Sequence, residues 1–342
     1  MNHLDYLDAA RDAVKLRAGL IPAIAAHPAA QEISTGPRML RAIAELCGAK
    51  HSADRPISNS PNAAFAAGLA TSDFKALLSD FGKSATLAQL TAHSAHKQIC
   101  ATRRLINFKQ TLFPSADLRG ELVEMEEGAE AKTTVHLSET SGLYAKLRTF
   151  GTNVFVSEVL IKNDDVGALA SLFGNIGAES ARLEARMVYS LLESNTTLSD
   201  GELMFHTGHG NIVASALDSN SLGAGMAALH NQPTPGGGPA NLGAEILLVS
   251  PELELTARTL INQAGMKITV ISSPWLATGR WYLIAKPELA PVIGLLRLGT
   301  APDGVITGPA RDNKIRTGVL VAVRADLGAV ALGRVGIIKG GV

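Results

Sequence analysis

Cysteine is scarce in this sequence, with only Cys47 and Cys100 among 342 residues. Two thiols supply neither a disulfide framework nor a four-cysteine zinc site, so we expect both to be reduced. No apolar run reaches roughly 18 residues, the length that a membrane-spanning helix needs. The first eight residues include acidic side chains where a signal peptide needs basic ones. We therefore expect the chain to be synthesised in the cytoplasm and not to associate with a membrane.

An excess of charge of either sign is also missing. The 31 Lys and Arg residues balance 31 Asp and Glu residues, whereas nucleic-acid readers carry a clear basic excess. This balance argues against sequence-specific DNA binding. Hydrophobic residues make up 46% of the chain and the mean hydropathy is +0.16. The composition predicts two or three globular modules with part of their surface covered by partner subunits.

Charge is unevenly distributed along the chain. Residues 1–120 hold 14 basic and 9 acidic residues, a surplus of five positive charges. Residues 121–142 have the opposite surplus, with Lys132 against Glu121, Glu124, Glu126, Glu127, Glu130 and Glu139. Alternation from Thr134 to Ser138 and the central Gly128 predict a long β-hairpin in this segment that has no apolar face of its own. Two interpretations stay open: a solvated loop, or an arm laid over a basic neighbouring subunit.

The N-terminal third is predicted to be helical. Residues 1–50 form two short helices broken by Pro22, Pro28 and Pro37, and residues 51–64 form a polar linker. A second helical zone extends from Ser72 to Arg104 with an interruption near Gly82. Lys97, Arg103 and Arg104 in this zone indicate a solvated helix face, or an inner shell surface that touches DNA phosphates.

The longest predicted helix covers residues 164–194. Asp164 and Asp165 suit the positive end of a helix dipole. One apolar stripe follows from the spacing of Leu169, Phe173, Ile176, Leu183, Met187 and Leu191. At roughly 1.5 Å per residue, this helix would be about 45 Å long.

From residue 218 onward the pattern alternates between helix and strand. We expect helices from Ser219 or Ser221 to His230 and from Ser250 to Gly265, the second with Ser250 as N-cap and Pro251 at its first position. Strands are expected at 246–249, 268–271 and 281–284, and an antiparallel pair at 319–323 and 330–338 that turns at 326–328. This order predicts the α+β class.

Few residues offer chemistry. His206 and His209 lie three residues apart in a glycine-rich segment and could ligate a metal. No residue at a recognisable spacing from them could serve as a third or fourth ligand. Residues 174–177 and 236–238 lack the full phosphate-loop pattern. Paired carboxylates within Glu121–Glu130 sit in a hydrophilic segment rather than a rigid cleft. The sequence thus predicts no catalytic site, no metal site and no cofactor.

The ordered motifs carry a resemblance to a known family. The chain resembles major capsid proteins of tailed bacteriophages with the Hong Kong 97 fold, and is most similar to those of Mu-like phages and of phages that fuse a ClpP-like prohead protease to the capsid protein. The stretch 150–211 carries it most specifically. The matching motifs are Ser72-Asp73-Phe74, Leu77-Leu78, Phe108-Lys109, Glu127-Gly128-Ala129-Glu130, Thr149-Phe150-Gly151, Ile161-Lys162-Asn163-Asp164-Asp165, Leu191-Leu192, Asn195, Asp200-Gly201, Leu203-Met204-Phe205-His206, His209-Gly210-Asn211, and more weakly Trp281-Tyr282-Leu283, Pro291-Val292-Ile293 and Asp326-Leu327-Gly328-Ala329.

The resemblance implies a domain plan. Residues 1–64 would be an N-terminal arm kept in the shell or a scaffolding-like segment removed by a protease. Residues 65–118 would begin the peripheral domain and 119–150 would be the extended β-hairpin loop. The peripheral domain would continue over 151–215, with the spine helix at 164–194. Residues 216–310 would form the axial domain, and 311–342 would return as strands to the peripheral domain.

The implied function is structural. By resemblance, the chain is no enzyme and assembles with itself into pentamers and hexamers of an icosahedral virion capsid in the host bacterial cytoplasm. Its partners would be portal, scaffolding and decoration proteins and nonspecifically packaged double-stranded DNA. Inter-subunit contacts would involve the acidic segment, and Gly128, Gly142 and Gly151 would act as hinges. The alternatives are an encapsulin-type nanocompartment shell and a metal-dependent hydrolase using His206 and His209.

The sequence also departs from the family. Glu158 follows Ser157 where the family often has Arg, so the resemblance does not support a family salt bridge at the hinge of the loop. Residues 1–50 match nothing in the family. No motif supports the covalent Lys–Asn cross-link of the fold's namesake.

Overall fold

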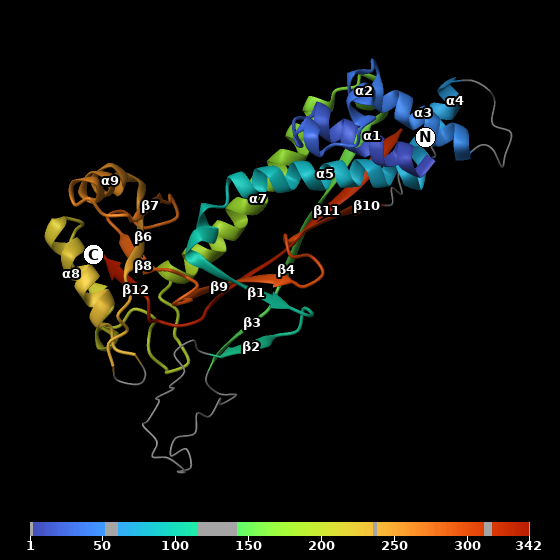
Figure 1. Cartoon of the computed structure of the whole chain (residues 1–342). Coiled ribbons are helices and arrows are strands. Elements are labelled where there is room, and N and C mark those ends of the chain that lie inside the picture. Colours follow the sequence, from blue (N-terminus) through green and yellow to red (C-terminus); the bar gives the residue numbers. More distant parts are fainter. Residues whose placement is uncertain (1–2, 52–60, 115–141, 235–237, 311–316, 342) are drawn as a thin grey trace, which may run out of the picture. The chain divides into compact units, whose positions relative to one another are not determined.

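The computed structural model describes residues 3–51, 61–114, 142–234, 238–310 and 317–341. The chain divides into two compact units (Figure 1). The first unit contains residues 1–93, 149–182 and 301–326, and the second contains 94–148, 183–300 and 327–342. Helix α7 (Val166–Glu193) and strand β11 (Gly318–Ala331) contribute residues to both units. Among the described residues, no helix has the length and apolar character to cross a membrane.

Helices dominate the first unit. They are α1 (His3–Arg17), the 3-10 turn η1 (Ala23–Ala25), α2 (Ala30–Thr35), α3 (Met39–His51), α4 (Pro61–Ala70), α5 (Ser72–Ala92), α6 (Glu158–Lys162) and the first part of α7. Strand β4 (Arg148–Ser157) and β10 (Val305–Pro309) both pair with β11. Apolar side chains of α1, α3, α5, α7 and β11 share one core. The prediction of two N-terminal helices was wrong, because the three prolines separate three helices and a 3-10 turn.

Two further predictions for this region need correction. The linker expected at 51–64 ends earlier, because Pro61 begins α4, a first-turn position that suits proline; residues 52–60 lie outside the described part. The helical zone has no break at Gly82, since α5 passes through it. Gly82 instead makes room for an aromatic ring, because a Cβ there would lie 2.7 Å from Cε1 of Phe173. Residues 100–105 form strand β1, not helix.

Besides the short pair of β2 (Thr111–Pro114) and β3 (Gly142–Ala145), the described part of the second unit contains two groups of paired strands. In one, β1 (Cys100–Leu105) pairs with β9 (Ile293–Leu298) in parallel, and β9 pairs with the end of β11 in antiparallel. The other is a five-stranded sheet in the order β5 (Ile212–Val213), β12 (Ile337–Gly340), β8 (Trp281–Ala285), β6 (Ala244–Val249) and β7 (Thr269–Ser272). Short 3-10 turns η2 (Ala95–Ile99), η3 (Thr207–His209) and η4 (Pro251–Leu253) connect the elements.

Alternate residues of β6 and β8 pack on opposite faces of the five-stranded sheet, as the period of a strand requires. Leu247 and Leu283 share a core with α8 (Ser219–Asn231) and α9 (Glu254–Gln263). Leu248 and Ile284 share another core with the last part of α7. Both faces are therefore buried, which explains why the strands read as continuous apolar runs. The predicted α+β class is confirmed.

The elements of the second unit largely follow the prediction. Strands β6, β7 and β8 lie within two residues of the expected ranges, and α9 is followed at Gly265 by a left-handed residue with φ of 62°. Helix α8 begins at Ser219, one of the two expected starts, with Asp218 as its N-cap, and Ser221 completes a capping box with Asp218.

The predicted C-terminal hairpin was wrong. Strand β11 runs unbroken from Gly318 to Ala331 through the residues 326–328 that were expected to turn. Asp326 is fully buried within the strand and accepts a 2.8 Å hydrogen bond from the Thr149 hydroxyl. A turn-forming residue type stays in the strand because its carboxylate has a partner on the neighbouring segment.

Candidate functional site

A short antiparallel pair of strands flanks the acidic segment in the sequence. Its candidate contact residues Glu121, Glu124, Glu126, Glu127, Glu130, Lys132 and Glu139, and the candidate hinge Gly128, lie outside the described residues. Strand β2 (Thr111–Pro114) pairs with β3 (Gly142–Ala145), with Phe113 opposite Leu143 and Pro114 opposite Gly142. Pro114 and Gly142, the described residues on either side of 115–141, are thus held side by side. The hairpin over 119–150 and the hinge role of Gly142 stay predictions.

Gly151 has a clear packing reason. It lies in β4, where a Cβ would sit 3.3 Å from the carbonyl oxygen of Val323 in β11. The glycine allows the two strands to approach closely. Its hinge role stays a prediction.

Exposed cations flank the acidic segment on both sides in the sequence. They are Arg103, Arg104, Lys109, Lys146 and Arg148, called the flanking cations below, and all belong to the second unit. None of them forms an ion pair within the described part of the chain. The expectation of a helix face was wrong, because Arg103 and Arg104 are consecutive residues of β1 and so point to opposite faces of the strand.

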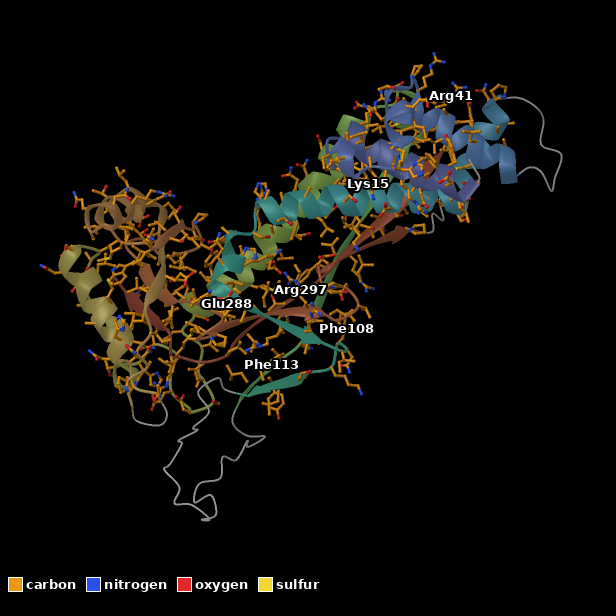
Figure 2. The ribbon with its side chains drawn as sticks, viewed as in Figure 1. Lys15, Arg41, Phe108, Phe113, Glu288 and Arg297 are labelled. Carbon is orange, nitrogen blue, oxygen red and sulfur yellow. The ribbon has the colours of Figure 1, made fainter. Side chains whose placement is uncertain are left out.

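Apolar side chains are exposed close to these cations along the chain. Ile106 is 95% exposed, Tyr144 is 61% exposed, and Phe108 lies in the turn after β1 (Figure 2). A pocket of about 360 Å³ is lined by Tyr144, Lys146, Arg148, Met187, Leu191 and Gly328, among others, with no carboxylate in its lining. The surface combines positive charge with exposed apolar groups, which is typical of an interface rather than of a catalytic cleft.

The two candidate metal-binding histidines lie in a tight turn. Their rings stand edge to face with centroids 5.5 Å apart. His206 Nδ1 accepts a hydrogen bond from the Gly208 amide at 3.2 Å, and the buried His209 places Nε2 3.2 Å from a carboxylate oxygen of Asp200. Gly210 closes the turn with φ of 62°. In the segments that the structure covers, no three His, Cys, Asp or Glu side chains gather in a way that could hold a metal ion.

A buried ionic cluster is the feature that sequence reasoning missed. Glu184 of α7 binds Nε2 of His96 at 2.8 Å and forms an ion pair with Arg297 of β9, and the side chains of all three residues are at most 3% exposed. Burial alone would raise the pKa of Glu184, but the hydrogen bond from His96 and the charge of Arg297 outweigh it and hold the pKa below its ordinary value. Burial also raises the pKa of the nearby Cys100 thiol. The one available signal was an arginine inside the apolar run Ile293–Leu298.

This cluster is closed to solvent. Arg297, labelled in Figure 2, lies on β9 inside the second unit. Its charge balances that of Glu184, and both are removed from water together. The arrangement holds three segments of the second unit in place, and it offers no open position for a substrate.

The family comparison gives a direct result. The family model described as phage capsid protein matches residues 140–340, more than half of the chain. No curated protein matches.

Solved structures of low sequence identity also match. A phage-related protein from Bordetella bronchiseptica RB50 is 10% identical with a TM-score of 0.49, over 75% of this chain and 95% of that one. A virus-like particle protein from Pyrococcus furiosus is 11% identical with a TM-score of 0.49, over 76% and 98%. The capsid protein of cyanophage P-SCSP1u is 13% identical with a TM-score of 0.47, over 73% and 88%. By the family match, the chain belongs to the phage capsid protein family and is a structural major capsid protein of the virion, not an enzyme.

Proposed function

We propose that this chain forms pentamers and hexamers of an icosahedral, Hong Kong 97-like shell around double-stranded DNA, assembled in the cytoplasm of a bacterial host. The observation that carries the proposal is the match of residues 140–340 to the phage capsid family. The order of elements agrees with it: a two-stranded base for the acidic segment, a 28-residue helix, and a sheet buried on both faces. Portal, scaffolding and decoration proteins are the further partners that such a shell requires.

Shell closure requires many copies to bind each other through weak contacts that add up. Each contact can be modest, because a closed assembly makes the contacts cooperative. Several large apolar side chains are between 73% and 96% exposed in the single chain, among them Ile24, Ile106, Leu255 and Leu289. Burial between copies would remove this apolar surface from water.

The acidic segment and the flanking cations suggest how copies recognise each other. Residues 121–142 carry a surplus of five negative charges, and the five flanking cations have no carboxylate partner among the described residues. Opposite charges across an interface fix register and discourage wrong pairings. We infer that the acidic segment of one copy lies on the flanking cations of another.

Charge reversal tests this contact. Changing Glu124, Glu126 and Glu127 together to Lys should reduce shell formation at least tenfold while the subunit stays folded by circular dichroism. The matched control reverses three exposed carboxylates elsewhere, Glu32, Glu245 and Glu288, whose side chains form no ion pair or hydrogen bond with other described residues. It changes net charge by the same amount and should leave assembly largely intact. Normal shells from the first variant would refute the acidic contact.

Particle content separates a phage shell from an encapsulin-type nanocompartment. The nanocompartment is the weaker candidate, because the family model that matches is that of phage capsid protein. Expression with the neighbouring genes, followed by negative-stain microscopy and nucleic-acid analysis, should give large particles that contain DNA. Particles that enclose a protein cargo and no DNA would support the alternative instead.

A further inference from the structure

The helices of residues 3–51 share the core of the first unit with later parts of the chain. Leu7 and Val14 of α1 and Leu40 and Ile43 of α3 are at most 6% exposed. They belong to the same buried cluster as Phe74, Leu77 and Phe81 of α5, Phe173 of α7 and Val321 of β11. A segment that is later removed would leave this apolar surface exposed to water.

A buried carboxylate also depends on this segment. Asp164 has φ of 58°, a left-handed conformation that is uncommon outside glycine, and its side chain is 6% exposed. It accepts hydrogen bonds from the backbone amides of Met39 at 2.9 Å and Leu40 at 2.7 Å, and from Nη1 of Arg17 at 2.7 Å. All three donors of this carboxylate therefore come from residues 3–51.

Asp164 and Asp165 cap different helices. Asp165 accepts a 2.8 Å hydrogen bond from the Ala168 amide and so caps the first turn of α7. Asp164 accepts from the first two amides of α3, where the positive end of the helix dipole favours a carboxylate. The adjacent pair thus joins the start of α7 to the start of α3.

Two more contacts hold the N-terminal helices. Lys15 of α1 lies beside α5 (Figure 2) and its Nζ is 2.5 Å from a carboxylate oxygen of Asp80. Helices α3 and α4 approach each other closely at Gly48 and Gly68. A Cβ added at Gly48 would lie 1.9 Å from the Ala64 carbonyl oxygen, and a Cβ added at Gly68 would lie 1.8 Å from the Ala44 carbonyl oxygen. This approach is possible only with glycine at both positions.

We propose that residues 3–51 stay in the assembled shell as an integral part of the subunit, locked by Asp164, and are not a removable scaffolding-like segment. Removal would take away all three hydrogen-bond donors of Asp164 and expose the apolar side chains that the segment covers, which is unfavourable. Any maturation cleavage of the subunit would then fall outside residues 3–51. The role in a shell depends on the proposed function, whereas the lock itself can be tested on the unassembled chain.

The lock can be tested by cutting the full chain between α3 and α4. A recognition site for a sequence-specific protease is inserted between residues 55 and 56, and the folded protein is digested until no intact chain remains. We expect the N-terminal fragment to co-elute with the remainder in gel filtration and to separate only in denaturant. An N-terminal fragment that separates in native buffer, while the remainder keeps its circular dichroism spectrum, would overturn the proposal.

Variants of the aspartate pair make the test specific. Asp164→Ala in the cut protein should weaken retention of the fragment at least tenfold, and Asp164→Asn, which keeps one acceptor oxygen, should weaken it less. Asp165→Ala is the matched control, because it removes only the cap of α7. Equal retention in the Asp164→Ala and Asp165→Ala proteins would overturn the role of Asp164.

Intact mass of subunits from purified particles tests the role in the shell. We expect every subunit to contain residues 3–51, and subunits that begin after residue 51 would overturn the proposal. Failure to form particles would count against the proposed function alone, because the retention of the cut fragment is measured without assembly.

Discussion

The two units each bury a carboxylate associated with α7, and they satisfy it in different ways. Asp164 precedes the helix in the first unit and is bound by two backbone amides and an arginine whose side chain is 34% exposed. Glu184 lies within the helix in the second unit and is bound by His96 and Arg297, which are almost fully buried. A helix N-terminus stabilises the first charge, whereas the second depends on two other titratable side chains.

This difference predicts different sensitivity to mutation. A backbone donor is not deleted by a change of side chain, so Asp164 keeps two of its three donors as long as α3 stays in place, even if Arg17 is replaced. Glu184 can lose its compensating charge through one substitution. Of its two described partners, Arg297 is always positively charged, whereas His96 is charged only when protonated. The second unit should therefore be the more vulnerable to a single loss of charge.

The largest effect is expected for Arg297→Met. It leaves Glu184 buried without its counter-ion and should lower the free energy of unfolding by about 3–5 kcal/mol, measured by urea denaturation. The double variant Glu184→Gln with Arg297→Met removes both charges and should recover much of the loss. A single variant that is as stable as the native protein would show that the ion pair contributes nothing.

Asp164→Ala should have the next largest effect. It removes the cap of α3 and leaves buried amides without an acceptor, at a cost of about 2–4 kcal/mol. The same unfolding experiment should give about 1 kcal/mol for Asp165→Ala, an ordinary cap loss. If both variants lost the same amount, Asp164 would be no more than a second helix cap.

Glycine substitutions compare packing within the two units. Gly68→Ala in the first unit would place Cβ 1.8 Å from the Ala44 carbonyl oxygen and should destabilise by about 1–3 kcal/mol. Gly223→Ala in α8 of the second unit meets nothing within 4 Å and should stabilise by about 0.4–1 kcal/mol. Thermal unfolding of both variants measures the contrast, and a neutral Gly68→Ala would contradict the close approach of α3 and α4.

The smallest effect concerns acid. The pKa of Glu184 is lower in the folded than in the unfolded chain, so its contribution to stability is complete above the unfolded value of about 4.3 and is lost as pH falls toward the folded value. Unfolding free energies measured from pH 5 downward should fall more steeply for the native protein than for the Glu184→Gln, Arg297→Met variant. Parallel curves would contradict the lowered pKa.

Local signals predicted much of the fold. The apolar stripe of α7, strands β6 to β8 and the glycine that follows α9 lie where the sequence indicated. Errors arose where tertiary contacts override residue type. Gly82 stays helical because the Phe173 ring occupies the space beside it, and Asp326 stays in β11 because Thr149 binds its carboxylate.

The candidate site was less predictable from the sequence. Asp164 was expected to favour its own helix dipole, but it caps a helix that begins 125 residues earlier at Met39. The partners of Glu184 are likewise distant, since His96 lies 88 residues away, and no local spacing reveals such contacts. The acidic segment was visible as composition, and its contact role stays a prediction.

Sedimentation velocity of the purified full-length chain over a wide range of concentration is the most direct test of the central claim. We predict that, above a threshold concentration, the chain forms large closed particles in one narrow boundary, while free subunits stay at a constant level. A chain that sediments as a compact monomer at every concentration and salt would contradict a shell-building role.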